Sequence, residues 1–335
     1  MIDDARALRD QVVPHDLYHR DGEIDVLTAA LSPLVDGGHG DHILLTGPSG
    51  TGKTTLAKHT CEQLERETFD VSWGYVNCVT ESTKASALYS LLRDGGLGGD
   101  LRKEGTPAST FVERLREFDG QFVAVIDEVD VLDDPTVLLS LYELPNVCLF
   151  LVCVNGDAFY RGAEQRVVSR LRSCVTADLD PYTTSEMFDI LWARAKWAFT
   201  PGVVNRETVE YVALLAGGDA RLGIGILRRA ARHGRREGLA TIDIDVIDSI
   251  VDDAQKEIAT RYVEKLSTHQ RLMYEIIREH GPVGATELHA TYIEQATSPR
   301  ASSTRRGWLA SMEREGLIET EGRGRGKTYD TAYNT

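Results

Sequence analysis

The sequence has no long apolar segment and few aromatic residues. No apolar run in the 335 residues approaches the roughly 20 that a helix needs to span a bilayer. The charged residues 1–10 also lack the apolar core of a secretion signal. We therefore expect a cytoplasmic protein without membrane contacts. Aromatic residues are only 7% of the chain, but hydrophobic residues are 42%. That fraction is enough for ordinary packed cores, and the length predicts two or three domains.

The five cysteines include no close pair of the kind that holds structural zinc or forms a redox motif. Cys148 and Cys153 lie in or beside one apolar run, so we interpret the cysteines as buried free thiols of a reducing compartment. Lysine is also scarce, since arginine supplies 29 of the 37 basic residues. The net charge is −15, and residues 262–335 contribute none of it because they carry ten basic and ten acidic residues. An acidic, arginine-rich chain suggests a protein adapted to high salt; an ordinary acidic protein is the alternative.

Helices alternate with strands in the first half of the chain. We predict helices at residues 24–35, 54–68, 85–93 and 109–118, and strands at residues 42–46, 71–77, 122–126 and 147–154. Strands that alternate with helices in this way form a parallel sheet covered on both faces. The fold class is therefore α/β, with a nucleotide-binding domain at residues 1–181.

The second half of the chain has a different pattern: from about residue 184 the spacing of apolar residues predicts helices rather than alternating strands and helices. Helices are predicted at residues 185–199, 206–216, 220–234 and 244–257, which form a helical lid domain at residues 182–260. Three more helices, at residues 266–280, 285–291 and 303–315, precede two short strands at 317–320 and 327–330. Three helices followed by a two-stranded hairpin is typical of a winged helix, here residues 261–335.

A glycine-rich motif follows the first predicted strand and opens a helix. The motif is Gly47, Pro48, Ser49, Gly50, Thr51, Gly52, Lys53 and Thr54, followed by Thr55. It matches the phosphate-binding P-loop, whose backbone N–H groups and helix N-terminus cradle phosphate oxygens. Lys53 is expected to reach the β- and γ-phosphates of ATP, and the Thr54 hydroxyl to bind Mg²⁺.

Two acidic residues end the strand at 122–126. Asp127 is expected to hold Mg²⁺, largely through water, and Glu128 to orient and deprotonate the attacking water. The alternative is a strand that simply ends in solvated acids. Asn155 ends the next predicted strand, where its amide would position water near the γ-phosphate; an Asn-Gly turn is the alternative.

Arg221 lies in the first turn of a lid helix that Asp219 is expected to cap. It would reach back to the γ-phosphate and link the lid to the nucleotide; a surface arginine that balances the acidic chain is the alternative.

The order of these motifs resembles AAA+ ATPases, and further features are similar to the origin-recognition initiator family of archaea and eukaryotes. The features are Val13-Pro14 followed by His19-Arg20-Asp21, residues 167–171 followed by Asp180-Pro181-Tyr182, and residues 218–221 followed by Arg228-Arg229-Ala230. With the predicted winged helix, the resemblance covers nearly the whole chain. The sequence departs from the family pattern at residues 85–107. The family insertion is expected there, but this stretch is short and rich in glycine.

The resemblance implies roles for further residues. The N-terminal segment with Val13, Pro14 and Arg20 would hold the adenine, and Tyr182 would mark the aromatic entry to the lid. Arg170 would act as an arginine finger on ATP bound by a neighbouring protomer, or inside its own site if the protein stays monomeric, with Arg166 as a less favoured candidate. Lys53, Glu128 and Arg170 are thus the expected catalytic residues, and ATP or ADP with Mg²⁺ the expected ligands.

The C-terminal end is slightly basic on an acidic protein, since residues 298–335 hold seven basic and five acidic residues. Expected contacts with duplex DNA come from the start of the last helix and from the Gly-rich turn; they are Arg300, Thr304, Arg305, Arg306, Arg323, Arg325 and Lys327. A winged helix that contacts protein instead is the alternative.

The favoured function is a nucleoid-associated initiator that binds origin DNA, uses ATP as a slow switch and recruits the replicative MCM helicase, with other initiator protomers as further partners. Two alternatives stay open: a nucleotide-bound paralogue that regulates promoters, and an AAA+ loader or transposition-associated ATPase that works through protein contacts.

Overall fold

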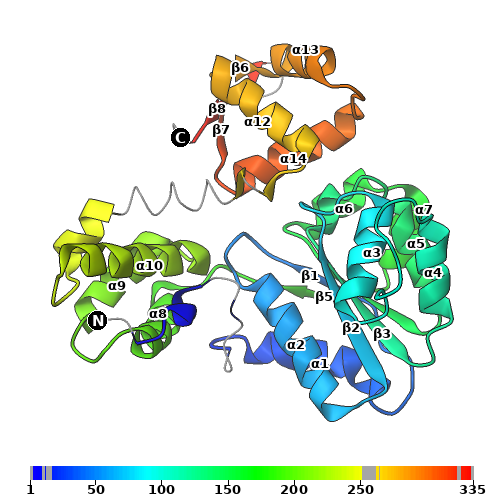
Figure 1. The fold of residues 1–335 in the computed structure, drawn as a ribbon, viewed down its shortest axis with the longest axis horizontal. Coiled ribbons are helices and arrows are strands. Elements are labelled where there is room, and N and C mark those ends of the chain that lie inside the picture. The colour runs from blue at the N-terminus through cyan, green and yellow to red at the C-terminus, as the bar shows by residue number, and fades with distance from the viewer. Residues whose placement is uncertain are drawn as a thin grey trace.

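The computed structural model describes residues 3–9, 12, 17–250, 262–263, 265–322 and 326–332. Val13, Pro14, Arg323 and Arg325, which the sequence assigned to the adenine site and the wing, lie outside the described residues. The chain forms three groups of elements: a sheet with helices, a helical lid beside it, and a C-terminal group above both (Figure 1).

The first group contains a five-stranded sheet in which every pair is parallel, with strand order β2-β3-β4-β1-β5. The strands are β1 (Ile43–Thr46), β2 (Val71–Asn77), β3 (Gln121–Asp127), β4 (Val147–Val152) and β5 (Val175–Asp178). The first four agree with the predicted strands to within two residues. The edge strand β5 was not predicted, because its four residues alternate with polar side chains and include no apolar run. The predicted α/β class is confirmed.

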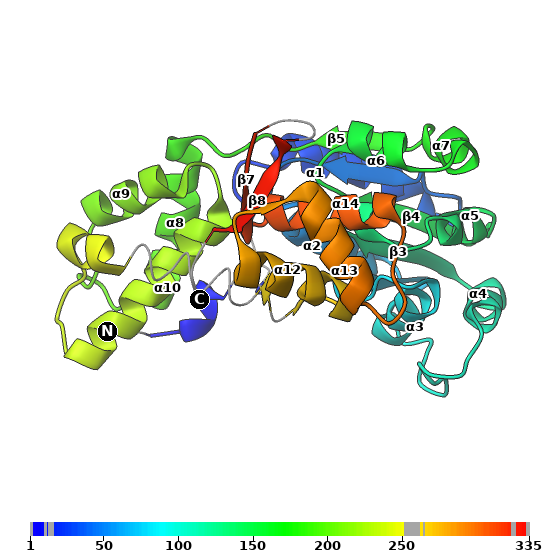
Figure 2. The same ribbon diagram turned by 90° about the horizontal axis from the view of Figure 1, so that it is seen from above.

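Helices cover both faces of the sheet, and the strand residues alternate between two cores (Figure 2). One face carries α1 (Asp21–Leu31) and α2 (Lys53–Glu67). The other carries α3 (Lys84–Asp94), α4 (Ala108–Arg116), α5 (Thr136–Tyr142), α6 (Gly156–Gly162) and α7 (Gln165–Leu171). Because both faces are buried, β3 and β4 read as continuous apolar runs. All parallel strands also end at one edge, where the predicted nucleotide motifs follow them.

Within the described residues there are three short 3-10 helices: η1 (Ala5–Leu8), η2 (Ser32–Leu34) and η3 (Val129–Val131). η1 packs on the lid helices, and Arg194 of the lid donates to the carbonyl oxygens of Ala7 and Arg9. The sequence interpretation, which placed residues 1–181 in one domain, did not include this contact between the N-terminal segment and the lid.

The lid consists of α8 (Thr184–Ala198), α9 (Arg206–Ala216), α10 (Ala220–Glu237) and a helix that starts at residue 244. Local signals explain these helices. Thr183 and Glu186 form a capping box at α8, and Asn205 and Asp219 cap α9 and α10. Gly217 ends α9 in the left-handed conformation, which glycine adopts without a steric penalty. The predicted cap by Asp219 is confirmed.

The C-terminal group consists of α12 (Thr268–His280), β6 (Val283–Gly284), α13 (Ala285–Gln295), α14 (Ser302–Arg314), β7 (Ile318–Glu321) and β8 (Thr328–Thr331). The predicted two-stranded hairpin is in fact a three-stranded antiparallel sheet of order β6-β8-β7, because the two residues of β6 pair with β8. This is the element order of a winged helix. In the view of Figure 1, α14 is the labelled helix of this group that lies nearest the sheet of the first group.

Among the described residues, no helix is long and apolar enough to cross a membrane.

Candidate nucleotide-binding site

The P-loop joins the end of β1 to the start of α2, and three of its glycines have backbone angles that favour glycine. Gly47, Gly50 and Gly52 have φ values of 143°, 75° and 90°. Gly52 occupies the N-cap of α2 and supplies no side chain to the first turn. The N–H groups of that turn therefore remain available to an anion, and the positive end of the helix dipole adds to the attraction.

Two of these glycines also allow close packing against the surrounding chain. A Cβ atom on Gly47 would lie 2.4 Å from the carbonyl oxygen of Leu179, and one on Gly50 would lie 2.0 Å from Oδ1 of Asp219. The N–H of Ala220, in the first turn of α10, donates to the carbonyl of Gly50 at 3.1 Å. The P-loop is therefore the point at which the sheet and the lid meet.

Lys53 is buried within the P-loop, and no carboxylate of the described residues lies within hydrogen-bond distance of its ammonium. Nζ donates to the carbonyl oxygens of Gly47 and Pro48, each at 2.8 Å. Burial lowers the pKa of Lys53, whereas the nearby charges of Glu128 and Asp127 act to raise it. A buried cation that donates to two neutral carbonyl groups, beside the N–H groups of a helix N-terminus, fits a polyphosphate.

Asp127 ends β3 beside the first turn of α2. Its Oδ2 accepts hydrogen bonds from the Thr54 hydroxyl at 2.7 Å and from the Tyr75 hydroxyl at 2.8 Å. Hard oxygen ligands next to a phosphate site suit Mg²⁺. Sequence reasoning missed Tyr75. The only signal was its place in β2, two residues before the end of that strand.

Glu128 has an unusual backbone and environment. Its φ of 53° lies in the left-handed region, which is uncommon for a residue other than glycine and clusters at functional sites. Burial and then Glu315 raise the pKa of Glu128 to about 8, although Arg314 acts in the opposite direction. Its Oε2 accepts a hydrogen bond from Nη2 of Arg314 at 2.8 Å.

Asn155 follows β4 and lies beside the P-loop, since the N–H of Gly47 donates to the carbonyl of Val154 at 3.2 Å. Its side-chain oxygen caps α6 by accepting from the N–H of Ala158 at 2.8 Å. Asn155 thus has a local structural role in addition to its predicted place near the site.

Arg20 and Tyr182 lie on the lid side of the P-loop. Arg20 is buried, and its guanidinium donates to the carbonyl oxygens of Thr51 at 3.1 Å and Asp180 at 2.9 Å. It also donates to the Tyr182 hydroxyl and lies 4.1 Å from the centre of that ring. Arg20 therefore connects the P-loop to the chain that enters the lid.

Arg221 reaches the P-loop from the first turn of α10. One of its nitrogens donates to the Ser49 hydroxyl, and another pairs with Glu315 of the C-terminal group at 2.7 Å. The side chain is 24% exposed, so the alternative of a freely solvated surface arginine does not describe it.

The remaining residues predicted for the nucleotide site differ in position. Thr55 is half-buried on α2. Arg170 is exposed on α7, and Arg166 on the same helix pairs with Glu164. The structure therefore does not bring Arg170 to the P-loop of its own chain, a position that fits action on a neighbour.

The expected DNA contacts of the C-terminal group differ in exposure. Arg306 is exposed and Thr304 is half-buried, but Arg305 is 7% exposed. The Arg305 guanidinium donates to the carbonyl of His289 at 3.1 Å and lies over the Tyr292 ring. Arg305 therefore packs inside its own domain, contrary to the expectation of a surface contact.

One face of α14 and the turn before it lie against the sheet domain. Arg300 is 3.8 Å from Asp133, a Cβ on Gly307 would lie 3.9 Å from the carbonyl of Asp130, and Arg314 pairs with Glu128 and Asp130. Gly307 and Arg314 are seven residues apart and so lie on one side of α14, and Arg300 lies just before this helix. Lys327, by contrast, pairs with Glu313 of its own domain at 3.2 Å.

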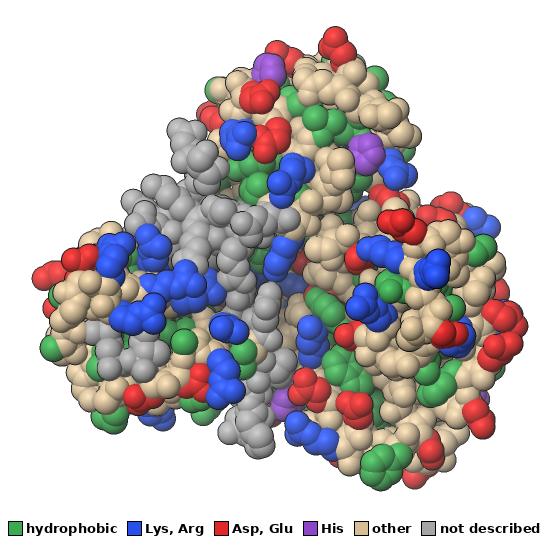
Figure 3. Space-filling view, viewed as in Figure 1, with side chains coloured by type: hydrophobic (Ala, Val, Ile, Leu, Met, Phe, Trp, Pro, Cys, Tyr) green, Lys and Arg blue, Asp and Glu red, His purple; other side chains and the backbone are tan. Residues whose placement is uncertain are grey.

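The space-filling view shows how charge is distributed on one face. Basic side chains gather over the lid, where α10 carries Arg228, Arg229, Arg232, Arg235 and Arg236, whereas acidic side chains spread over the outer parts of all three groups (Figure 3). The basic charge of this face thus lies toward the centre of the molecule.

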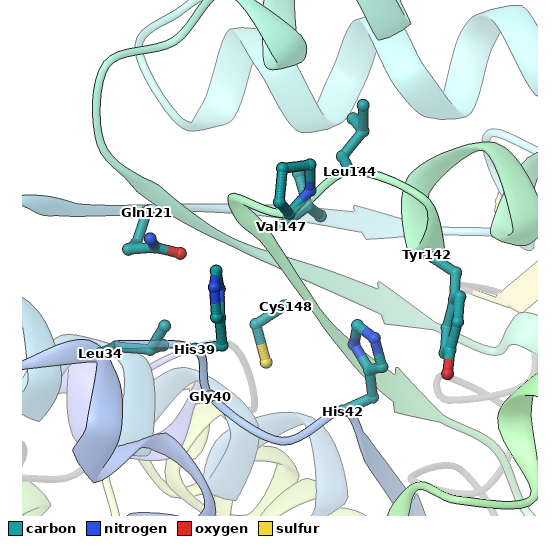
Figure 4. A pocket seen from close by; sticks show the side chains of 10 residues that line it. Leu34, His39, Gly40, His42, Gln121, Tyr142, Leu144, Val147 and Cys148 are labelled. Atoms are coloured by element: carbon teal, nitrogen blue, oxygen red, sulfur yellow. The ribbon is translucent and has the colours of Figure 1, made fainter. Parts of the chain in front are cut away.

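A pocket opens at the opposite edge of the sheet (Figure 4). Gln121 and Val147, the first residues of β3 and β4, line it with His42, which precedes β1. The P-loop follows the last residue of β1, so this pocket is separate from the nucleotide cluster. None of the predicted site residues lines it.

Comparison with family models supports the architecture. Residues 16–149 match the AAA ATPase domain, and residues 188–255 match the Cdc6 AAA+ ATPase-type lid domain. The fold and the P-loop cluster therefore define the chain as a protein of AAA+ ATPase type with a helical lid.

Comparison with known sequences narrows this class. The chain is 36% identical to ORC1-type DNA replication protein 9 of Halobacterium salinarum, over 100% of this chain and 95% of the relative. It is also 36% identical to ORC1-type DNA replication protein 1 of the same organism, over 90% of this chain and 98% of the relative. The chain belongs to the family of ORC1-type DNA replication proteins. The source of these relatives agrees with the predicted adaptation to high salt.

Solved structures give the same picture. The ORC1 protein of Aeropyrum pernix in complex with DNA has a TM-score of 0.73 at 27% identity, and the match covers 98% of this chain and 92% of that one. The ORC2 protein of the same organism, in ADPNP and ADP complexes, has a TM-score of 0.66 at 21% identity, with 99% and 94% covered. At that identity the second match supports the fold alone.

Proposed function

We propose that this protein is a replication initiator that binds ATP and duplex origin DNA. The observation that carries the nucleotide part is the convergence of Lys53, Thr54, Asp127 and Arg221 on one P-loop whose glycines have positive φ. Nothing else in the described residues provides a comparable set of phosphate donors beside magnesium ligands. The DNA part is supported by the winged-helix element order and by the relatives named for DNA replication.

Each site residue has a defined task in this proposal. Lys53 and the free N–H groups of α2 bind phosphate oxygens, and Thr54 with Asp127 holds Mg²⁺, which neutralises phosphate charge. Glu128 takes a proton from the attacking water, Asn155 orients that water, and Arg221 contacts the γ-phosphate. Arg20 and Tyr182 line the adenine side. Arg170 acts on ATP held by a neighbouring protomer.

Binding of a fluorescent ATP analogue tests the nucleotide site. We expect Lys53→Ala to weaken binding at least a hundredfold, because a buried charged hydrogen-bond donor to phosphate is lost. Lys103→Ala is the matched control, since Lys103 is an exposed lysine that pairs with Glu81. Equal affinity of both variants would contradict the proposed site.

In this proposal ATP sets the conformation of the protein and is hydrolysed slowly, so it acts as a switch rather than driving repeated cycles of movement. Glu128→Gln removes the proposed base and keeps the shape of the side chain, so it should bind ATP and fail to hydrolyse it. We expect this variant to retain the ATP-state affinity for duplex DNA and for the MCM helicase. Equal DNA and helicase binding by the ATP and ADP forms of the wild type would refute the switch.

Genome-wide mapping of the bound protein separates the initiator from its alternatives. Peaks at replication start sites support an initiator that recruits the MCM helicase at origins. Peaks confined to promoters would instead support a paralogue that acts as a regulator. Absence of duplex affinity would favour an AAA+ loader that works through protein contacts. The short stretch at residues 95–107, between α3 and α4, supplies little additional surface for sequence-specific DNA recognition.

A further inference from the structure

The last turn of α14 reaches from the C-terminal domain into the nucleotide site. Arg314 donates to Oε2 of Glu128 at 2.8 Å and to Oδ2 of Asp130 at 3.2 Å. Its neighbour Glu315 accepts from Nη1 of Arg221 at 2.7 Å. Arg314 and Glu315 are adjacent and opposite in charge. They therefore pair with an acidic residue, Glu128, and a basic residue, Arg221, of the nucleotide site.

These pairs are shielded from solvent on both sides. The exposed fractions of the side chains are 17% for Arg314, 14% for Glu128, 7% for Glu315 and 24% for Arg221. Ion pairs of this kind are screened less by salt than fully exposed pairs, and leaving one partner unpaired is costly. The other contacts along α14, Arg300 with Asp133 and Gly307 beside Asp130, continue the same interface.

Both contacts occupy residues that the proposed reaction needs. A Glu128 carboxylate that accepts from Arg314 has fewer acceptor sites left for water, and the adjacent positive charge makes it a weaker base. Likewise, an Arg221 guanidinium held by Glu315 and the Ser49 hydroxyl has fewer N–H groups left for a phosphate. Glu315 also places a negative charge near Lys53, where it acts on the pKa of that lysine. A polyanion at the P-loop would therefore compete with Glu315 for the same cations.

We propose that Arg314 and Glu315 are positioning residues that hold the C-terminal domain against the nucleotide site and keep Glu128 and Arg221 out of use until ATP binds. This inference rests on the proposed function, because it assigns Glu128 and Arg221 to ATP. ATP and the docked C-terminal domain then oppose each other, and by linkage the weakening is reciprocal. The C-terminal domain is released when the site is filled.

Energy transfer between dyes measures docking in the full chain. One dye is placed at position 104, in the exposed loop after α3, and the other at position 294, on the exposed side of α13. The native cysteines are all buried, so cysteines introduced at these positions can be labelled selectively. We expect high transfer in the nucleotide-free wild type and lower transfer with ADPNP and Mg²⁺. Arg314→Ala should show the lower value without nucleotide, whereas Arg278→Ala, which loses only an exposed pair with Glu275, should not.

Affinity gives a second readout that a merely structural role would not produce. If the docked domain competes with nucleotide, Arg314→Ala should bind fluorescent ADPNP more tightly, by about tenfold for a coupling of ordinary size. Loss of fold or of site geometry would weaken binding instead. Arg314→Lys keeps the charge and should retain most of the docking.

A charge exchange keeps the proposal falsifiable if a single variant folds poorly. Arg221→Glu combined with Glu315→Arg should restore the docking signal that Glu315→Arg alone abolishes. Unchanged energy transfer in nucleotide-free Arg314→Ala, or wild-type protein that binds ADPNP and stays docked, would overturn the proposal. Failure of the proposed function is distinguishable, because it appears as nucleotide affinity that does not depend on Lys53.

Discussion

The nucleotide site has two borders that are built in different ways. On the lid side, Gly50 lies directly against Asp219, the N-cap of α10, and its carbonyl accepts from the N–H of Ala220. Arg20 donates to carbonyl oxygens of the P-loop and of the lid entry. On the side of the C-terminal domain, the described contacts include the charged side chains Arg314 and Glu315. The first border depends on shape and the second on charge.

This difference has a physical consequence for motion and regulation. Backbone contacts at van der Waals distance tolerate no added atom, so the lid border is expected to stay formed whenever the protein is folded. Ion pairs can exchange one anionic or cationic partner for another without rebuilding the backbone. The charged border is therefore the one that a bound nucleotide can open.

The largest effect on the lid border is expected from a methyl group added at Gly50, where the P-loop contacts the lid. Gly50→Ala would place Cβ 2.0 Å from Oδ1 of Asp219 and 2.8 Å from its Cα, at a φ of 75°. We expect the free energy of unfolding to fall by about 4 kcal/mol, from steric overlap and left-handed strain together, with loss of nucleotide binding. Urea titration measures the change.

Gly96→Ala is the matched control, because Gly96 has the same φ of 75° and no atom within 4 Å of its added Cβ. It should lose only the strain component, about 1 kcal/mol. If both variants lose the same stability, close packing at the P-loop is not what the lid border depends on.

Removal of the arginine that spans the lid border should have the next largest effect. Arg20→Ala leaves the carbonyl oxygens of Thr51 and Asp180 without this donor and removes the stack on Tyr182. We expect a loss of about 3 kcal/mol in the free energy of unfolding, measured by urea titration. Arg116→Ala, which breaks an exposed pair with Glu113, should change it by less than about 0.5 kcal/mol. A small effect at Arg20 would show that the lid is held by packing alone.

The charged border should make stability depend on pH through Glu128. Its pKa is raised to about 8 in the folded protein, chiefly by burial, from an ordinary value of 4.5. A raised pKa means that stability from this group is fully present below pH 4.5 and is lost as pH rises through 8. Glu128→Gln cannot ionise, so the nucleotide-free wild type should lose on the order of 5 kcal/mol relative to it between these limits. Parallel unfolding curves against pH would contradict this expectation.

The smallest effect that we expect is on the salt dependence of DNA binding, and it should differ between two neighbouring arginines of α14. Arg306→Ala should reduce the slope of duplex affinity against salt concentration by about one, because an exposed arginine on the proposed DNA face neutralises one phosphate. Arg305→Ala should leave the slope unchanged and lower the thermal stability of the C-terminal domain, since its guanidinium packs on His289 and Tyr292. Equal slopes for both variants would show that α14 does not contact the phosphate backbone through Arg306.

The nucleotide cluster was predictable because each motif follows a strand of one parallel sheet. The apolar runs before Gly47 and Asp127 predict buried strands. Because parallel strands end at a common edge of the sheet, the two motifs must lie close together. Tyr75, Arg314 and Glu315 carried no such signal, because nothing in their local sequence indicates which side chain they face. The same limit explains Arg305: helical spacing predicts the helix but does not state which arginine is buried against α13.

The sequence by itself determined the α/β class, the P-loop with its magnesium and water-activating carboxylates, and the order of helices in the lid and the C-terminal domain, since these follow from local periodicity, turns and caps. Only the tertiary structure decided which charged side chains form ion pairs with one another across the domains. Arg221 and Glu315 are 94 residues apart in the sequence, and Glu128 and Arg314 are 186 apart. An ion pair at such separations depends on how domains dock, and docking is decided by the complementarity of whole surfaces rather than by any motif.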